Sequence, residues 1–101
     1  SVCKVPIVSS DIQSAWAQYT IQPKNRHNLQ SRLKDVGIPS VVYYPIALSE
    51  QIGYKHHPSV SSGVGKSKLL SKTVLSLPMH PYLEEVDISR ICSEVEKNSS
   101  K

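Results

Sequence analysis

The segment 15–44 constrains the fold most, because a strand pattern, a helix pattern and a second strand pattern follow one another closely there. Ala15, Ala17, Tyr19 and Ile21 alternate with the residues between them, a period-two pattern rich in aromatic and β-branched side chains that predicts a strand ending at Pro23. The run 38–44 is also rich in β-branched and aromatic residues and predicts a second strand. That strand is expected to stop at Pro45, because proline cannot donate a hydrogen bond to a β-ladder.

A helix is predicted between these two strands. Asn25 is a suitable N-cap, because its side chain can accept a hydrogen bond from a backbone N–H of the first turn. Leu29, Leu33 and Val36 follow at i, i+4 and i+7 and therefore share one face of the helix. Gly37 is expected to close the helix, because glycine adopts the left-handed conformation readily.

The second half of the chain continues the alternation after a less regular stretch. Glycine, proline and a run of serines predict a mobile loop over 46–65. A helix over about 66–73 and a third strand over 74–77, stopped by Pro78, are expected next. The last helix, about 84–97, has the clearest amphipathic pattern. Its apolar face carries Ile88, Ile91, Cys92 and Val95.

Three short strands alternating with helices predict an α/β (α+β) two-layer sandwich, a small three-stranded sheet with helices packed on one face. Spacing does not determine the strand directions. We expect an irregular N-terminal segment over 1–14, one domain over 15–97 and a disordered tail over 98–101.

Composition limits both the core and the class of partner. The chain has 101 residues, 39% of them hydrophobic, with no Phe and one Trp, so a small core of aliphatic side chains is expected. The formal net charge is +4, but Lys and Arg are spread singly, which argues against nucleic-acid binding. No run is apolar enough for a membrane span and no signal peptide is evident, so we expect a cytoplasmic protein without a membrane partner. Cys3 and Cys92 lack paired spacing, and we expect a loose thiol and a buried one respectively.

Three short motifs could be read as chemical sites, and none predicts one. The segment 62–67 is similar to the end of a phosphate-binding loop, but Val60 stands where the first glycine is needed, which favours a hinge. His56 and His57 point to opposite sides of an extended backbone, so no metal site is expected. His80 has no local partner to orient it, which favours packing or capping. No catalytic residue is predicted.

Four motifs in a fixed order carry a family resemblance over about residues 14–97. The matching residues are Ser14, Trp16 to Ile21, Arg26, Leu29, Leu33, Gly37, Ile38, Val42 to Pro45, Leu48, Gln51 and Val74 to Leu83. With these residues the chain resembles the C-terminal small domain of the DegT/DnrJ/StrS family of nucleotide-sugar aminotransferases, which depend on pyridoxal phosphate and have the aspartate aminotransferase fold type I. The resemblance implies an antiparallel or mixed sheet.

The resemblance also implies a reaction and a division of labour between domains. In the intact family enzyme a lysine of the large domain holds pyridoxal phosphate, and an amino group passes from glutamate to a nucleotide-linked keto sugar. None of the lysines in this chain lies in the sequence context of that lysine. The chain alone is therefore expected to hold no cofactor and to be inactive.

The small domain of the family forms one wall of the substrate site. The residues that the resemblance places there are Tyr43, Tyr44, Ser49 and Gln51. For the two tyrosines an equally open alternative is packing within a strand. Ala47 stands where the family usually has proline, and Ser49 stands where a histidine or another polar residue is common, which bears on sugar recognition. The residues implied for the core are Trp16, Tyr19, Leu29, Leu33, Leu75, Leu77, Ile88 and Ile91.

Two hypotheses of different classes follow for the function. The chain is either a C-terminal domain fragment of a sugar aminotransferase, or a stand-alone binding or regulatory module. Such a module would dock on an aminotransferase or bind a nucleotide sugar through the loop 43–51. A third hypothesis, a basic nucleic-acid binder, is disfavoured by the scattered charge. An apolar face that no large domain covers predicts a homo-oligomer, with an aminotransferase large domain as the other candidate partner.

Overall fold

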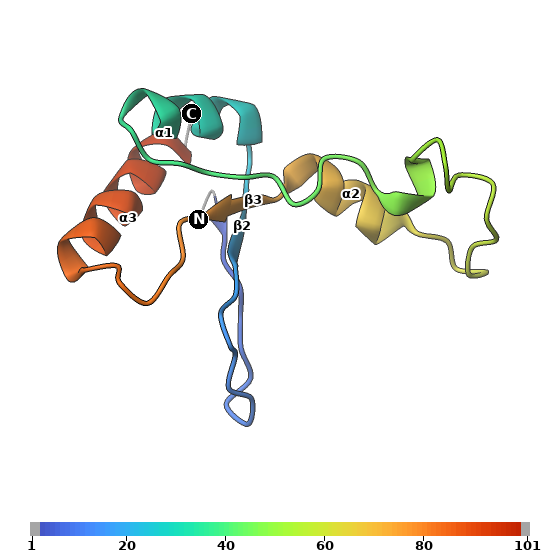
Figure 1. The fold of residues 1–101 in the computed structure, drawn as a ribbon, viewed down its shortest axis with the longest axis horizontal. Helices are drawn as coiled ribbons and strands as arrows, with labels where there is room; N and C mark the ends of the chain where they lie inside the picture. The colour runs from blue at the N-terminus through green and yellow to red at the C-terminus, as the bar shows by residue number, and fades with distance from the viewer. Residues whose placement is uncertain (1–2, 100–101) are drawn as a thin grey trace.

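The structure is a computed structural model that describes residues 3–99, without the side chain of Ser99. Its elements alternate along the chain as shown in Figure 1. They are β1 (Cys3–Lys4), β2 (Tyr19–Pro23), α1 (Arg26–Asp35), the 3₁₀-helix η1 (Leu48–Glu50), α2 (Gly65–Thr73), β3 (Leu75–Leu77) and α3 (Glu85–Ser99).

The three described strands form one sheet in the order β1-β2-β3, and both pairs are antiparallel. In the register, Cys3 lies opposite Pro23 and Ile21 lies opposite Leu75. The predicted fold class, a small three-stranded sheet with helices on one face, is confirmed, and the strands run antiparallel. Two strand predictions need correction, because β1 lies in the segment 1–14 that was expected to be irregular, and no strand forms over 38–44.

Local backbone features explain the differences in strand position. In the segment 38–44 Val41 makes an isolated antiparallel bridge with Ser76, and proline at 39 and 45 limits further pairing. The first predicted strand, 15–21, begins later, at Tyr19. The backbone of Trp16 has φ 48°, a left-handed conformation that interrupts an extended strand.

The helices lie close to their predicted positions. Asn25 caps α1, because its Oδ1 accepts a hydrogen bond from the backbone N–H of Asn28 at 3.0 Å. Gly37 has φ 78° and its N–H donates to the Lys34 carbonyl at 3.0 Å, which closes the helix as expected. α3 continues to Ser99, so the predicted disordered tail 98–101 begins inside a helix, and residues 100–101 lie outside the described residues.

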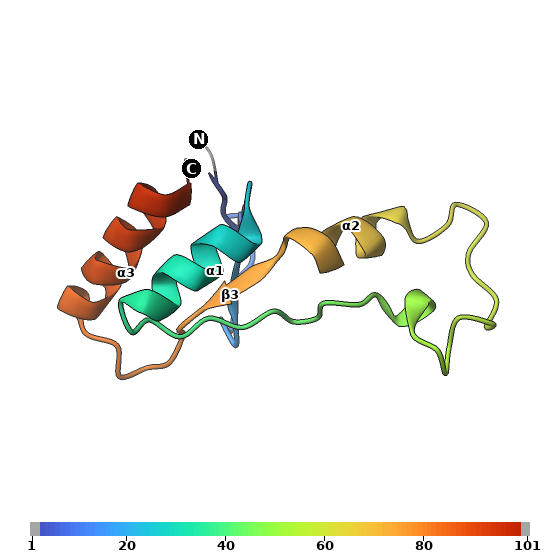
Figure 2. The ribbon, with the colours of Figure 1, turned by 90° about the horizontal axis from the view of Figure 1, so that it is seen from above.

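The core lies between one face of the sheet and the helices α1 and α3, which run side by side in Figure 2. Its buried members are Ile21, Leu29, Leu33, Ile38 and Leu75, with Cys3, Tyr19, Val42, Leu77, Ile91 and Val95 half-buried around them. The predicted core is therefore confirmed for Tyr19, Leu29, Leu33, Leu75, Leu77 and Ile91.

Two predicted core residues are wrong. Trp16 is 36% exposed, because it lies beyond the sheet in the arm that joins β1 to β2, where its ring contacts Tyr19. Ile88 is 47% exposed, because it lies at the margin of the face that α3 buries. The two cysteines also exchange their expected places. Cys3 packs against the core, and Cys92 is exposed on α3.

Two extensions project from this small core. The arm 5–18 between β1 and β2 points away from the helices in Figure 1. The loop after Val42 and α2 project on the side opposite α3, as Figure 2 shows. The radius of gyration is 15.6 Å, whereas a compact domain of about 100 residues has a radius of gyration of about 13 Å. The chain is thus more extended than a self-contained domain of its length.

Candidate functional site

The predicted substrate residues follow a short pairing between Val41 and the sheet. The Val41 N–H donates to the Ser76 carbonyl at 3.0 Å, and the Ser76 N–H donates to the Val41 carbonyl at 2.8 Å. On β2 and β3 the side chains that alternate with the core residues point to the other sheet face. There the Thr20 and Ser76 hydroxyls are hydrogen-bonded at 2.9 Å. This pairing positions Tyr43 at the edge of that face.

Tyr43 lines a hollow of about 280 Å³. The residue is 42% exposed, and its ring meets the Tyr44 ring edge-on, with 5.5 Å between the ring centroids and 66° between their planes. Tyr44 is 68% exposed. The hollow is lined by Ala17, Gln18, Pro39, Ser40, Val41, Tyr43, Ser76, Leu77, Pro78 and Met79. It offers apolar surface, an aromatic edge and the Gln18 amide, which suit a ligand with both apolar and hydrogen-bonding faces.

Ser49 lies in a second hollow, of about 520 Å³, between the loop and the start of α2. Its Oγ is buried and has no hydrogen-bond partner among the described residues. A buried hydroxyl without a partner is costly, but this Oγ is inaccessible from the hollow in this structure, so a polar group could bind it only after a local shift of the loop. The lining residues are Leu48, Ser49, Tyr54, His57, Pro58, Ser59, Val60, Val64 and Ser67.

The structure does not bring the four predicted site residues into one cavity. Tyr43 and Ser49 line different hollows, whereas Tyr44 and Gln51 are exposed and line neither of them. Their role in substrate binding stays a prediction. The sequence reasoning missed Gln18 and Met79, although both lie inside the motifs that carried the family resemblance. Their position beside Tyr43 depends on the sheet, which no local pattern reveals.

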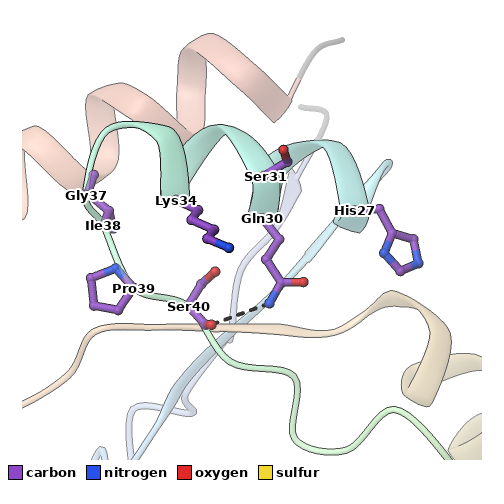
Figure 3. A pocket seen from close by; sticks show the side chains of 8 residues that line it. All are labelled: His27, Gln30, Ser31, Lys34, Gly37, Ile38, Pro39 and Ser40. Carbon is purple, nitrogen blue, oxygen red and sulfur yellow. Dashed lines mark hydrogen bonds between the residues drawn. The ribbon is translucent and has the colours of Figure 1, made fainter.

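A third groove, of about 780 Å³, runs beside α1, and Figure 3 shows the side chains that line it. The lining residues are His27, Gln30, Ser31, Lys34, Gly37, Ile38, Pro39 and Ser40. The Gln30 amide donates to the Ser40 carbonyl at 3.4 Å across the groove. None of the four predicted substrate residues lines this groove.

The α1 groove is the place to test whether described residues fit pyridoxal phosphate, because Lys34 lines it. A site for this cofactor needs a lysine together with an acidic or basic partner for the pyridine nitrogen. Lys34 is exposed, and the described lining of the groove has neither a carboxylate nor a guanidinium. These residues do not fit the cofactor, and no chemical step through it follows from them.

The histidines and the remaining motifs form no metal site within residues 3–99, where no group of three or more candidate ligands gathers. His56 and His57 lie in an exposed loop, where the His57 ring is 5.8 Å from the Tyr54 ring. The His80 Nδ1 accepts a hydrogen bond from the Tyr82 N–H at 3.2 Å, a local capping contact of the kind expected. No helix in this range is long and apolar enough to cross a membrane.

Both the sequence and the fold of this chain match those of one known protein family. Residues 2–96 match the sequence profile of the DegT/DnrJ/EryC1/StrS aminotransferase family. The chain belongs to this family, and the resemblance read from its motifs is confirmed. Its fold is also similar to that of a solved DegT/DnrJ/EryC1/StrS aminotransferase from Brucella abortus. The two share 44% identity and a TM-score of 0.92 over 95% of this chain and 26% of that chain.

The names of two relatives specify UDP-linked sugars. The UDP-2-acetamido-2-deoxy-3-oxo-D-glucuronate aminotransferase of Pseudomonas aeruginosa is 38% identical over 91 residues, which cover 87% of this chain and 24% of that protein. The UDP-N-acetyl-3-dehydro-alpha-D-glucosamine 3-aminotransferase of Acidithiobacillus ferrooxidans is 32% identical over 94 residues, covering 93% and 25%. The chain thus spans about a quarter of the length of these relatives.

Proposed function

We propose that these residues serve as the C-terminal small domain of a cytoplasmic, pyridoxal-phosphate-dependent nucleotide-sugar aminotransferase. The reaction of the intact enzyme is amino transfer from glutamate to a nucleotide-linked keto sugar. The observation that carries this proposal is the family match over residues 2–96, combined with coverage of only about a quarter of each relative. The UDP-linked sugars in the names of both relatives favour a UDP-sugar substrate.

In this proposal the described residues contribute one wall of the substrate site. The exposed Tyr43 and Tyr44 rings present an aromatic surface and hydroxyl groups beside the 280 Å³ hollow. The Ser49 Oγ, which is buried and lacks a partner among the described residues, binds a hydroxyl or phosphate oxygen of the substrate once a local shift of the loop exposes it. The cofactor, which supplies the electron sink for the reaction, is held by the rest of the enzyme.

The test compares the chain alone with a chimera. In the chimera, this chain replaces the matching quarter of the Brucella abortus enzyme, which shares its fold. We expect the chimera to bind pyridoxal phosphate and to transfer the amino group of glutamate to a UDP-linked keto sugar. We expect the chain alone to show neither turnover nor a cofactor-dependent change in visible absorbance. Turnover by the chain alone would contradict the proposed division of labour, and a folded, cofactor-loaded chimera without turnover would contradict the proposed wall.

Matched variants of the chimera distinguish an effect on substrate binding from an effect on stability. Tyr44→Phe and Tyr44→Ala change an exposed ring, so they are expected to raise KM for the sugar without lowering thermal stability. Tyr82→Ala is the control, because Tyr82 is also a highly exposed tyrosine, at 85%, and lies outside the loop 43–51. If all three variants have the same KM for the sugar, Tyr44 does not belong to the substrate site.

The buried Ser49 hydroxyl also favours a second candidate, a module that binds a nucleotide sugar without the rest of an enzyme. Titration of the chain with UDP-N-acetylglucosamine, followed by the amide resonances of the loop 43–51, tests this function. If the amide resonances do not shift up to millimolar ligand, this second function is contradicted. Self-association of the chain through its exposed apolar residues is also part of the proposal, and a strictly monomeric sedimentation profile would contradict it.

A further inference from the structure

Arg26 joins the start of α1 to the end of α2. It is the first residue of α1, and its Nη1 donates to the Ser71 carbonyl at 2.5 Å and to the Val74 carbonyl at 3.4 Å. These carbonyls lie 45 and 48 positions away in the sequence. Figure 1 and Figure 2 both show the N-terminal end of α1 beside the C-terminal end of α2. One side chain therefore links the two helices.

The two carbonyls lie at a helix end that attracts a cation. The last carbonyls of an α-helix lack partners within the helix, and the helix dipole gives this end a partial negative charge. α2 ends at Thr73 with Val74 as its C-cap, so the guanidinium of Arg26 meets the negative end of α2. No carboxylate pairs with Arg26 among residues 3–99. The helix end thus takes the place of an anionic partner.

Burial makes this contact sensitive to the position of α2. The Arg26 side chain is half-buried, and its Nε is buried without a partner in the described part of the chain. Ser71 and Val74 are buried as well, at 5% and 8% exposed. A half-buried cation is costly unless its hydrogen bonds are made. A displacement of α2 that breaks the two bonds is therefore opposed.

Packing does little else to fix the direction of α2. Within this helix Ser71 is buried and Thr73 is half-buried, whereas the other residues are exposed. Both of these residues lie in its last turn. The first two turns of α2 thus project from the sheet with little covering of their own, and their direction depends on what holds the last turn.

The start of α2 forms one side of the hollow in which Ser49 lies. Val64 and Ser67 line this hollow of about 520 Å³ together with Ser49. A helix of nine residues is about 13 Å long, so a tilt of about 10° at its C-terminal end moves its start by about 2 Å. A shift of this size is enough to break hydrogen bonds that a ligand makes across the hollow.

We propose that Arg26 is a positioning residue of the sugar site. Its guanidinium fixes the direction of α2 and thereby the side of the Ser49 hollow that α2 forms. This inference rests on the proposed function, in which Ser49 belongs to the substrate wall. Arg26 lines neither the Tyr43 hollow nor the Ser49 hollow, so it acts through α2 and not through contact with the substrate.

Residual dipolar couplings of the 101-residue chain test the orientation without any ligand. The backbone N–H couplings of α1 and α2 are expected to fit one alignment tensor in the unmodified chain. In Arg26→Met, which keeps an apolar stem, the α2 couplings are expected to shrink and to leave that fit, whereas the α1 couplings stay in it. Arg32→Met is the matched control, because Arg32 is an exposed arginine of the same helix.

Two outcomes of this measurement overturn the proposal. One is a set of α2 couplings that still fit the α1 tensor in Arg26→Met, because the guanidinium then does not hold α2. The other is a set of α2 couplings that fail to fit that tensor in the unmodified chain, because α2 then has no fixed direction.

The Arg26 side chain also gives a test that needs no variant, which decides the contact if Arg26→Met fails to fold. Its buried Nε–H is expected to exchange slowly with water and to give a resonance at neutral pH. The Nε–H of exposed Arg32 is expected to exchange too fast to be seen. Equally fast exchange of both groups overturns the contact.

The chimera tests whether the direction of α2 matters for the sugar. Arg26→Met is expected to raise KM for the UDP-linked keto sugar several-fold with kcat nearly unchanged, because binding and not chemistry is disturbed. A loss of stability alone would reduce the amount of active enzyme and leave KM as it was. An unchanged KM in a folded Arg26→Met chimera overturns the positioning role. An unsubstituted chimera without turnover contradicts the proposed function instead, and the couplings of the chain still decide the orientation.

Discussion

The hydrogen bond between Thr20 and Ser76 gives the sharpest test of the sheet. The two hydroxyls lie 2.9 Å apart across the β2–β3 pair, and the residues are separated by 56 positions in sequence. Ser76 is 5% exposed and Thr20 is half-buried. The perturbation is a double-mutant cycle with Thr20→Val, which keeps the β-branched shape, and Ser76→Ala.

The expected magnitudes follow from burial. Thr20→Val leaves the nearly inaccessible Ser76 hydroxyl without its partner and is expected to lower the free energy of unfolding by about 1.5 kcal/mol. Ser76→Ala leaves the Thr20 hydroxyl, which water can partly reach, and is expected to cost about 0.5 to 1 kcal/mol. The double variant removes both polar groups, so it is expected to cost less than the two single changes together, with a coupling of about 1 kcal/mol.

The assay is urea unfolding of the chain followed by far-ultraviolet circular dichroism. With a slope of about 1.5 kcal/mol per molar urea, the Thr20→Val change shifts the midpoint by about 1 M. Additive costs in the cycle would refute the reasoning, because they would mean that the two hydroxyls do not bond to each other in solution. An unchanged midpoint for Thr20→Val would refute the β2–β3 register itself.

Three further outcomes are expected from the same fold. Leu33→Ala should lower the free energy of unfolding by about 3 kcal/mol, whereas Leu69→Ala, at an exposed position of the isolated chain, should change it by less than about 0.5 kcal/mol; equal costs would contradict the assigned core. Asn25→Ala should lower it by about 1 kcal/mol through loss of the α1 cap, and Asn25→Gly by less. Burial raises the pKa of the Cys3 thiol, so at about pH 8 iodoacetamide should modify exposed Cys92 faster than Cys3, as peptide mass spectrometry would show.

Local patterns predicted the helices well, because their signals lie within a few residues of one another. The cap at Asn25, the spacing of Leu29 and Leu33 and the left-handed Gly37 all act within one helix. The strands were predicted less well. β1 has only two residues and forms because β2 returns to pair with it, and the segment 38–44 has strand propensity but finds a partner only at Val41.

The candidate site was less predictable than the fold. The family motifs indicated the loop 43–51, but they did not show that Tyr43 and Ser49 line separate hollows. Gln18 and Met79 line the same hollow as Tyr43 because the sheet and the Val41 bridge bring three distant segments together. Such neighbours cannot be read from spacing, because each lies on a different element.

The amino-acid sequence by itself determined the family, the three helices and three residues at the centre of the core, Leu29, Leu33 and Leu75, whereas the buried Ile21 and Ile38 were not predicted. Helix caps, apolar periodicity and motifs are properties of the order of residues along the chain, so they can be recognised without knowing which distant segments come together. Only the tertiary structure decided the antiparallel order β1-β2-β3 and the exposure of α2 and of the loop before it. Strand pairing and burial depend on which distant surfaces meet, and sequence spacing does not show this.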